Sequence, residues 1–133
     1  MAARDREVLS GVIGEGAVWH VPPSAMPEYR GPHSGREAIL ALVTGAGGLF
    51  VEGSQRVDIH HIIAEGELAA ALFRQKARTT GGRDYDNLYT FFFRVRNGQI
   101  QELWENVDTG YFFGLFEIDP TWVREGEFRG HDM

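Results

Sequence analysis

Polar side chains interrupt an otherwise apolar and aromatic stretch between residues 85 and 95. Every second residue from Tyr85 gives Asn87, Tyr89, Phe91 and Phe93. Successive side chains of a β-strand point to opposite faces, so this set shares one face of a predicted strand. An amide and two phenols on an apolar face could orient a ligand by hydrogen bonds, or hold another polar side chain in place. Asn87 is therefore predicted to lie within an apolar cup.

Glu105, on the following predicted strand, is the candidate for moving a proton. It shares its alternation with Leu103 and Val107. Apolar surroundings raise the pKa of a carboxyl group and suit it to proton transfer near neutral pH. Arg74 is expected on the same inner face from the predicted strand at 66–79, and this leaves three interpretations open. Glu105 is an acid or base that faces the ligand, half of a structural ion pair with Arg74, or a side chain that is simply exposed.

The alternation of the predicted strands supplies the remaining lining of the cup. Trp19 and Val21 are expected to point inward from a short strand, with His20 pointing outward. The candidate catalytic residues are Glu105, Arg74 and Asn87, and the candidate ligand-binding residues are Trp19, Val21, Leu72, Tyr89, Phe91, Leu103 and Val107. No metal site is predicted, because the neighbouring His60 and His61 should face opposite ways and no third ligand has a matching spacing.

Short helices and long strands must position these residues. An apolar stripe that begins near Asp5 predicts a short helix, and the pattern Ser34-x-x-Glu37 predicts the start of a second helix. Four strand patterns follow, at 55–64, 66–79, 83–96 and 98–112, and Asn97-Gly98 predicts a tight hairpin between the last two. The fold expected is α+β, with a curved antiparallel sheet wrapped around short helices as a cone-shaped barrel. The chain is expected to form one domain, with a core at 5–116 and a tail at 117–133 that is irregular beyond Pro120 and anchored by Trp122.

The composition argues against several classes of protein. The 133-residue chain has a net charge of −6 and no stripe of lysines and arginines, so a nucleic-acid partner is not expected. It has no cysteine, which excludes thiolate catalysis and disulfides. No apolar run has a length that would span a membrane, and the charged N-terminus does not match a signal peptide. A cytoplasmic protein is therefore expected.

Several successive blocks resemble the SnoaL-like domains of the nuclear transport factor 2 superfamily, which also includes ketosteroid isomerase and limonene-epoxide hydrolase. The blocks are GAVWHVPPS, YRGPHSGREAI, HHIIAEGELAAALFRQKA, YDNLYTFFFRVRNGQI and ELWENVDTGYF, and together they cover roughly residues 7–115. The resemblance implies the cone-shaped α+β fold. It does not imply one reaction, because this fold carries many functions. The long N-terminal helix usual in the family is expected to be shortened here.

The resemblance also allows two known chemistries to be tested residue by residue. Where ketosteroid isomerase has its two acidic groups, this chain has Val21 and Phe91. The positions that match the Asp-Arg-Asp arrangement of limonene-epoxide hydrolase are Leu72, Arg74 and Glu105. Neither complete constellation is present, so Glu105 alone remains as the matching acid.

Three functions are consistent with these patterns. The first is an enzyme that acts on a small apolar oxygenated molecule by acid–base catalysis without a cofactor, as an isomerase, cyclase, dehydratase or hydrolase. The second is a ligand-binding protein with the same pocket and no chemistry, and the third is a dimerisation module. A homodimer is expected in each case, because Leu88 and Phe92 leave large apolar side chains on the outer face of the sheet.

Overall fold

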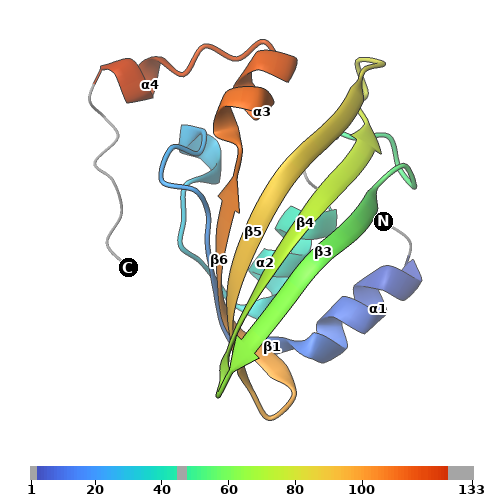
Figure 1. Ribbon diagram of the computed structural model, residues 1–133, viewed down its shortest axis with the longest axis vertical. Helices are drawn as coiled ribbons and strands as arrows, with labels where there is room; N and C mark the ends of the chain where they lie inside the picture. The colour runs from blue at the N-terminus through green and yellow to red at the C-terminus, as the bar shows by residue number, and fades with distance from the viewer. Residues whose placement is uncertain (1–2, 45–47, 126–133) are drawn as a thin grey trace.

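The computed structural model describes residues 3–44 and 48–125, as helices around one sheet (Figure 1). The helices are α1 (Ala3–Val12), α2 (Arg36–Thr44), α3 (Thr109–Leu115) and α4 (Thr121–Arg124), with one 3₁₀ turn, η1 (Pro27–Tyr29). The strands are β1 (Ile13–His20), β2 (His33–Ser34), β3 (Arg56–Glu65), β4 (Leu68–Arg78), β5 (Asp84–Arg96) and β6 (Gln99–Val107).

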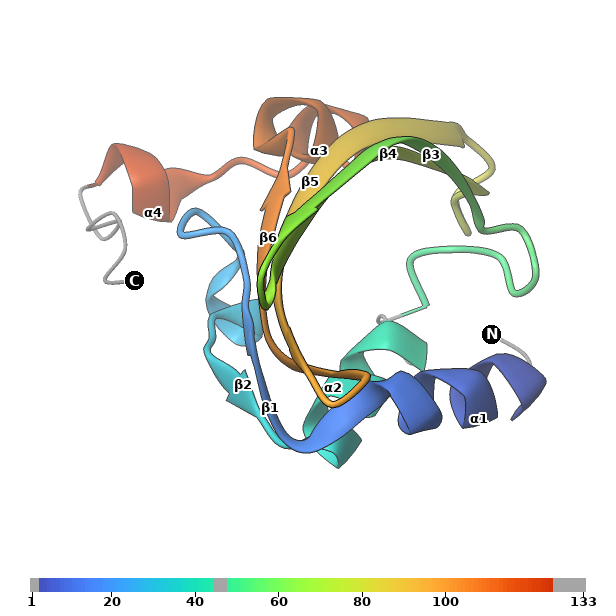
Figure 2. The same ribbon diagram turned by 60° about the horizontal axis from the view of Figure 1, so that its bottom comes forward.

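The six strands form one strongly curved sheet in the order β2-β1-β6-β5-β4-β3. Its concave side faces α1 and α2, so the sheet and helices enclose a cone (Figure 2). The expected α+β cone is confirmed, but the sheet is mixed and not purely antiparallel. Strand β1 runs parallel to β6, with Trp19 opposite Leu103, and along the chain the short β2 and helix α2 separate β1 from the four long strands.

The hairpin between β5 and β6 turns at Asn97-Gly98, as the sequence predicts. Both residues have positive φ, at 53° and 73°. This is the left-handed conformation that asparagine and glycine tolerate best, and it matches the twist of the strands that the turn joins.

The core lies where α2 meets the narrow end of the cone. Ile39 and Leu40 of α2 are each 1% exposed and pack against Ala17 of β1 and Leu103 of β6. The apolar side of α2 therefore covers this part of the sheet.

Two segments differ from the expectation. The last strand ends at Val107, because the side chain of Asp108 accepts a hydrogen bond from the amide of Tyr111 (3.0 Å) and caps α3. The tail is not irregular directly after Pro120, since Thr121–Arg124 form α4. Trp122 lies in α4, donates to the carbonyl of Ser24 (3.1 Å) and packs edge-on against Phe113.

Strand β3 also departs from simple alternation. Ile59 lies opposite Phe73, but His61 lies opposite Leu72, so the strand carries one extra residue at this point. A bulge of this kind moves the side chains beyond it to the other face. Simple alternation would place Val57, Ile59, His61 and Ile63 on one face, but His61 and Ile63 lie on the opposite face from Val57 and Ile59.

Candidate functional site

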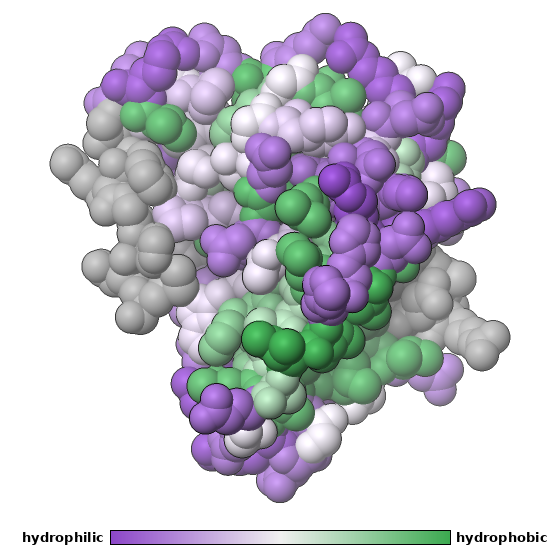
Figure 3. Space-filling model, viewed as in Figure 1, coloured by the Kyte–Doolittle hydropathy of each residue, from purple (hydrophilic) through white to green (hydrophobic). Residues whose placement is uncertain are grey.

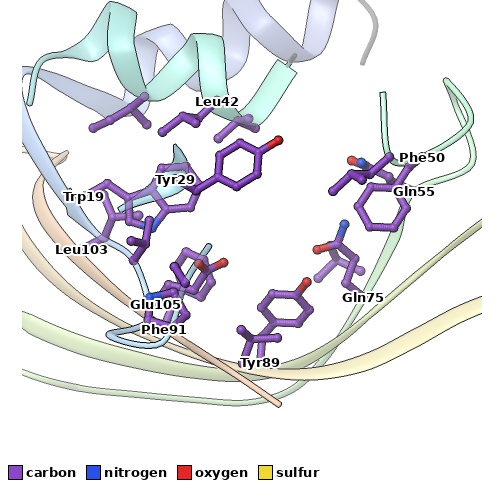
Figure 4. Close-up of a pocket in the computed structure, with 18 of the residues that line it drawn as sticks. Trp19, Tyr29, Leu42, Phe50, Gln55, Gln75, Tyr89, Phe91, Leu103 and Glu105 are labelled. Atoms are coloured by element: carbon purple, nitrogen blue, oxygen red, sulfur yellow. The ribbon is translucent and has the colours of Figure 1, made fainter. Parts of the chain in front are cut away.

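A cavity of about 1010 Å³ fills the cone between the concave face of the sheet and the helices. Its walls are mainly apolar and come from every long strand, from α1 and α2, and from the segments around residues 21–29 and 48–55. Figure 4 shows Trp19, Phe91, Leu103 and Glu105 at one end and Phe50, Gln55 and Gln75 at the other, with Tyr89 between them. The volume matches that of small-molecule sites, which combine apolar walls with a few polar groups.

Glu105 reaches the cavity from the middle of β6. It lies directly opposite Phe91 of β5, and both side chains line the cavity. Burial among apolar side chains raises the pKa of Glu105 to about 7. The Glu105 residue is half-buried and lines the cavity. At neutral pH this group can therefore both accept and release a proton.

Tyr89 faces the same cavity, two residues along β5 from Phe91. Its ring stacks on Phe73 with centroids 5.3 Å apart, which fixes the orientation of the phenol. The hydroxyl oxygens of Tyr85 and Tyr89 are 2.6 Å apart, and the amide of Asn87 donates to the Tyr85 oxygen at 3.0 Å. Burial raises the pKa of Tyr89, so its hydroxyl group stays protonated.

The direction of these hydrogen bonds follows from burial. Tyr85 is 1% exposed, and within the described residues its hydroxyl has no acceptor other than Tyr89. A buried hydroxyl proton without an acceptor is costly, so the satisfied arrangement has Tyr85 donate to Tyr89. The proton of Tyr89 is then free to point into the cavity. The chain of hydrogen bonds from Asn87 makes Tyr89 a donor toward a ligand.

Asn87 supports this chain but does not line the cavity. It is 1% exposed, and its amide nitrogen also donates to the carbonyl of Asp108 at 3.1 Å. Its oxygen accepts from the amide of Leu88 at 2.8 Å. Each polar atom of the side chain is thus occupied, and Asn87 ties β5 to the start of α3.

Arg74 and Leu72 lie on the opposite face of β4 from the one expected. Arg74 is paired with Leu88 on β5 and bonds to Asp86 at 3.2 Å on the convex side, so it forms no ion pair with Glu105. The face that lines the cavity carries Phe73 and Gln75. The expected inner face of β4 was therefore wrong by one residue.

The other sequence-predicted lining residues are brought together. Trp19 and Val21, Tyr89 and Phe91, and Leu103 and Val107 all line the cavity. His20 points outward and stacks on Trp104, with centroids 5.3 Å apart. Four further residues line the cavity and were not predicted from the sequence: Tyr29, Gln55, Phe73 and Gln75. For β4, the alternation of Arg74, Lys76 and Arg78 was an available signal, because three charged residues on one face indicate a solvated face.

Trp19 lines the end of the cavity that holds Glu105 (Figure 4). Its indole nitrogen is buried and has no hydrogen-bond partner within the described part of the chain. In the same part of the chain, no group of three His, Cys, Asp or Glu side chains is placed to hold a metal ion. None of the helices described there has the length and apolar character needed to cross a membrane.

The chain is similar to several solved structures. It aligns with an NTF2-like protein of unknown function from Burkholderia pseudomallei at 19% identity and a TM-score of 0.75, over 84% of this chain and 85% of that one. It aligns with TerC, co-crystallised with polyporic acid, at 20% identity and a TM-score of 0.74, over 86% and 87% of the two chains. IdmH of Streptomyces antibioticus, considered a polyketide cyclase, aligns at 22% identity and a TM-score of 0.69, over 87% and 89%.

These structures share the curved sheet and enclosing helices, and at this level of identity they establish the fold alone. No curated protein matches the sequence significantly. The family model of the SnoaL-like domain matches residues 1–103, which is most of the chain and includes five of its six strands and part of the sixth. The protein therefore belongs to the SnoaL-like domain family.

Proposed function

We propose that this SnoaL-like protein binds a neutral, apolar, oxygenated small molecule and moves a proton on it without a cofactor. The observation that carries the proposal is Glu105, a carboxyl group of pKa about 7 that faces an apolar cavity. A general acid or base works best when its pKa lies near the working pH. Such a group suits the isomerase and cyclase types of reaction.

The reaction proposed is the transfer of a proton from a carbon next to a carbonyl group. The Glu105 carboxylate takes the proton, and the electron pair of the C–H bond moves to the carbonyl oxygen as an enolate. Tyr89 donates a hydrogen bond to that oxygen, where the negative charge develops. Glu105 then returns the proton to the same carbon or to another one, so the protein is unchanged at the end.

The cavity also favours one shape of ligand. Glu105 supplies a carboxyl group at one end, Gln55 and Gln75 supply amide groups at the other, and Tyr89 lies between them (Figure 4). The walls between them are apolar and aromatic. We therefore infer an elongated ligand with oxygen atoms near both ends and an apolar body.

Deuterium exchange on 2-tetralone tests the proposal without knowledge of the natural substrate. This bicyclic ketone is neutral and apolar, and a proton next to its carbonyl group is readily removed. In D₂O we expect the protein to accelerate deuterium incorporation at that carbon, with a rate that rises as Glu105 ionises and is half-maximal near pH 7. Nuclear magnetic resonance measures both the exchange and the binding of the ketone.

Matched variants separate chemistry from binding. Glu105→Gln should abolish the acceleration while 2-tetralone still binds, because only the titrating group is lost. Tyr89→Phe should lower the rate by about 10²-fold, in the range typical of losing one donor to an oxyanion. Glu15→Gln, at an exposed position of β1, is the control and should leave the rate unchanged. If the wild-type protein binds 2-tetralone but exchange proceeds at the buffer rate, the alternative of a non-catalytic ligand-binding protein is favoured.

A further inference from the structure

Strand β3 is an uncovered edge of the sheet. It is last in the strand order, and among the described elements it packs only against β4. It forms the margin of the sheet in Figure 1, and all ten of its residues are exposed. A long exposed edge strand presents unpaired backbone groups and is a template for another strand.

The side chains of this edge are unusually apolar for a solvated strand. Ile59, Ile62 and Ile63 are 59%, 61% and 71% exposed. Figure 3 shows hydrophobic surface, in green, on the face of the molecule that is turned toward the reader. Exposed edges in soluble proteins are normally protected by charges or covered by another element. The apolar residues of β3 therefore favour a covered edge.

The bulge of β3 divides its residues into two faces. Val57, Ile59 and Ile62 lie opposite Gln75, Phe73 and Ala71 of β4, and these face the concave side. Ala64 belongs to the same face. Arg56, Asp58, His61, Ile63 and Glu65 belong to the convex face. The bulge places the concave residues at odd numbers before it and at even numbers after it.

We propose that β3 pairs with β3 of a second copy of this chain, antiparallel, about a two-fold axis between His60 and His61. In this register Val57 lies opposite Ala64 of the second copy, and Ile59 lies opposite Ile62 of the second copy. In each of these pairs one residue number is odd and the other is even. Both side chains lie on the concave face only because the bulge shifts the alternation by one residue. The two bulges face each other at the axis, where His60 of each copy lies opposite His61 of the other copy.

The charges support the same register. Arg56 lies opposite Glu65 of the second copy, and two-fold symmetry repeats this pair at the other end. Within the described residues neither Arg56 nor Glu65 forms an ion pair, and Arg56 lies opposite Lys76 on its own sheet, a like charge. A shift of one residue would place concave residues opposite convex ones. A shift of two residues in one direction would place Asp58 opposite Glu65. A shift of two residues in either direction would separate Arg56 from Glu65.

This pairing also bears on the cavity. Val57 lines the cavity and is 56% exposed, so the cavity wall at β3 borders solvent. The second copy would extend that wall with Ala64 and Ile62. The result is a continuous twelve-stranded sheet with one cavity on each side of the axis.

A charge-reversal experiment tests the register. We expect the wild-type protein to be a dimer by light scattering at micromolar concentration. Arg56→Glu alone or Glu65→Arg alone should give a folded monomer, because each places like charges opposite each other at both ends. The double variant Arg56→Glu with Glu65→Arg should restore the dimer. An equimolar mixture of the two single variants should form a heterodimer, since only that combination pairs opposite charges.

The control lies on the other apolar surface. Leu88 and Phe92 are each 40% exposed on the convex face and could form an interface of their own. Phe92→Arg should leave the β3 dimer intact. Circular dichroism confirms that each variant is folded. A monomeric wild-type protein, a dimer that persists in both single variants, or a dimer broken by Phe92→Arg would each overturn the proposal.

Discussion

The ionisation of Glu105 couples the candidate site to the stability of the protein. Burial raises the pKa of this carboxyl group from 4.5 to about 7, so the folded state resists its ionisation. Below about pH 4.5 the group is neutral in both states and imposes no penalty. As the pH rises from 4.5 to 7 the unfolded state ionises first, and stability falls by about 3 kcal/mol across this window.

Replacing Glu105 by Gln should remove that fall. The amide does not titrate. The free energy of unfolding of Glu105→Gln, relative to that of the wild-type protein, should therefore increase by about 3 kcal/mol from pH 4 to pH 8. Urea unfolding at these two pH values measures the difference, and the other carboxylates cancel because both proteins share them. Parallel stability curves across the window would mean that Glu105 is ionised and solvated in the folded state.

The sequence predicted the inward residues where hydropathy differs between the two faces of a strand. On β5, the face opposite Tyr89 and Phe91 includes the charged Asp86 and Arg94, so the alternation identifies the concave face. On β4, the run from Leu68 to Phe73 is apolar on both faces and gives no such contrast. The contrast appears only farther along β4, where Arg74, Lys76 and Arg78 share the solvated face, and the assignment of Leu72 and Arg74 to the inner face failed because it did not use this signal.

The hydrogen bonds of Asn87 could not be predicted from the sequence. Alternation placed Tyr85, Asn87 and Tyr89 on one face, but it could not distinguish an amide that faces a ligand from one that binds backbone. The decisive contact is with the carbonyl of Asp108, which depends on where α3 begins. That helix was itself missed, because the apolar run after Asp108 is also consistent with a strand.

At the scale of elements, the fold depends on how closely β1 approaches β6. Near this contact β1 contains two glycines, Gly14 and Gly16. A Cβ atom at Gly14 would lie 3.0 Å from the carbonyl oxygen of Ile100 and 2.7 Å from the side-chain oxygen of Gln101. At Gly16 nothing lies within 4 Å. The side chain of Gln101 can move aside, but the backbone of β6 cannot do so without disturbing the sheet.

The two glycines therefore make a matched pair of alanine variants. Gly14→Ala should destabilise the protein by about 1–3 kcal/mol, because a methyl group is forced against the backbone of β6. Gly16→Ala should leave stability unchanged or raise it by about 0.4–1 kcal/mol, since it only restricts the unfolded chain. Thermal unfolding of both variants measures the contrast, and equal melting temperatures would show that β1 can move away from β6.

The bulge in β3 is another feature that alternation could not reveal. The sequence from Val57 to Ile63 is consistent with one regular strand, and only pairing with β4 shows the extra residue. The general fold was predictable because the lengths of the strands and the Asn97-Gly98 turn are local signals. The parallel contact between β1 and β6 was not, because it joins segments more than 80 residues apart, and no local pattern specifies the direction of such a pair.

At the scale of the whole molecule, charge should select the ligands that enter the cavity. The chain has a net charge of −6, and the ionisable carboxylates among the lining residues are Glu52 and Glu105. The described lining includes no Lys, Arg or His side chain. An anionic ligand would thus lose its hydration without gaining a cation in return, which is unfavourable in an apolar site.

Two ligands of nearly equal shape, 2-naphthamide and 2-naphthoate, test this selection. At pH 8 Glu105 is largely ionised, so we expect the neutral amide to bind at least about tenfold more tightly than the carboxylate, a difference of about 1.4 kcal/mol. At pH 6 Glu105 is mostly protonated and can donate a hydrogen bond, so the gap should narrow. Glu105→Gln should also reduce the difference in affinity between the two ligands at pH 8, and that difference should no longer depend on pH. Titration calorimetry measures both affinities. If 2-naphthoate binds as tightly as 2-naphthamide at pH 8, a cationic group must reach the cavity, and a neutral ligand would no longer be favoured.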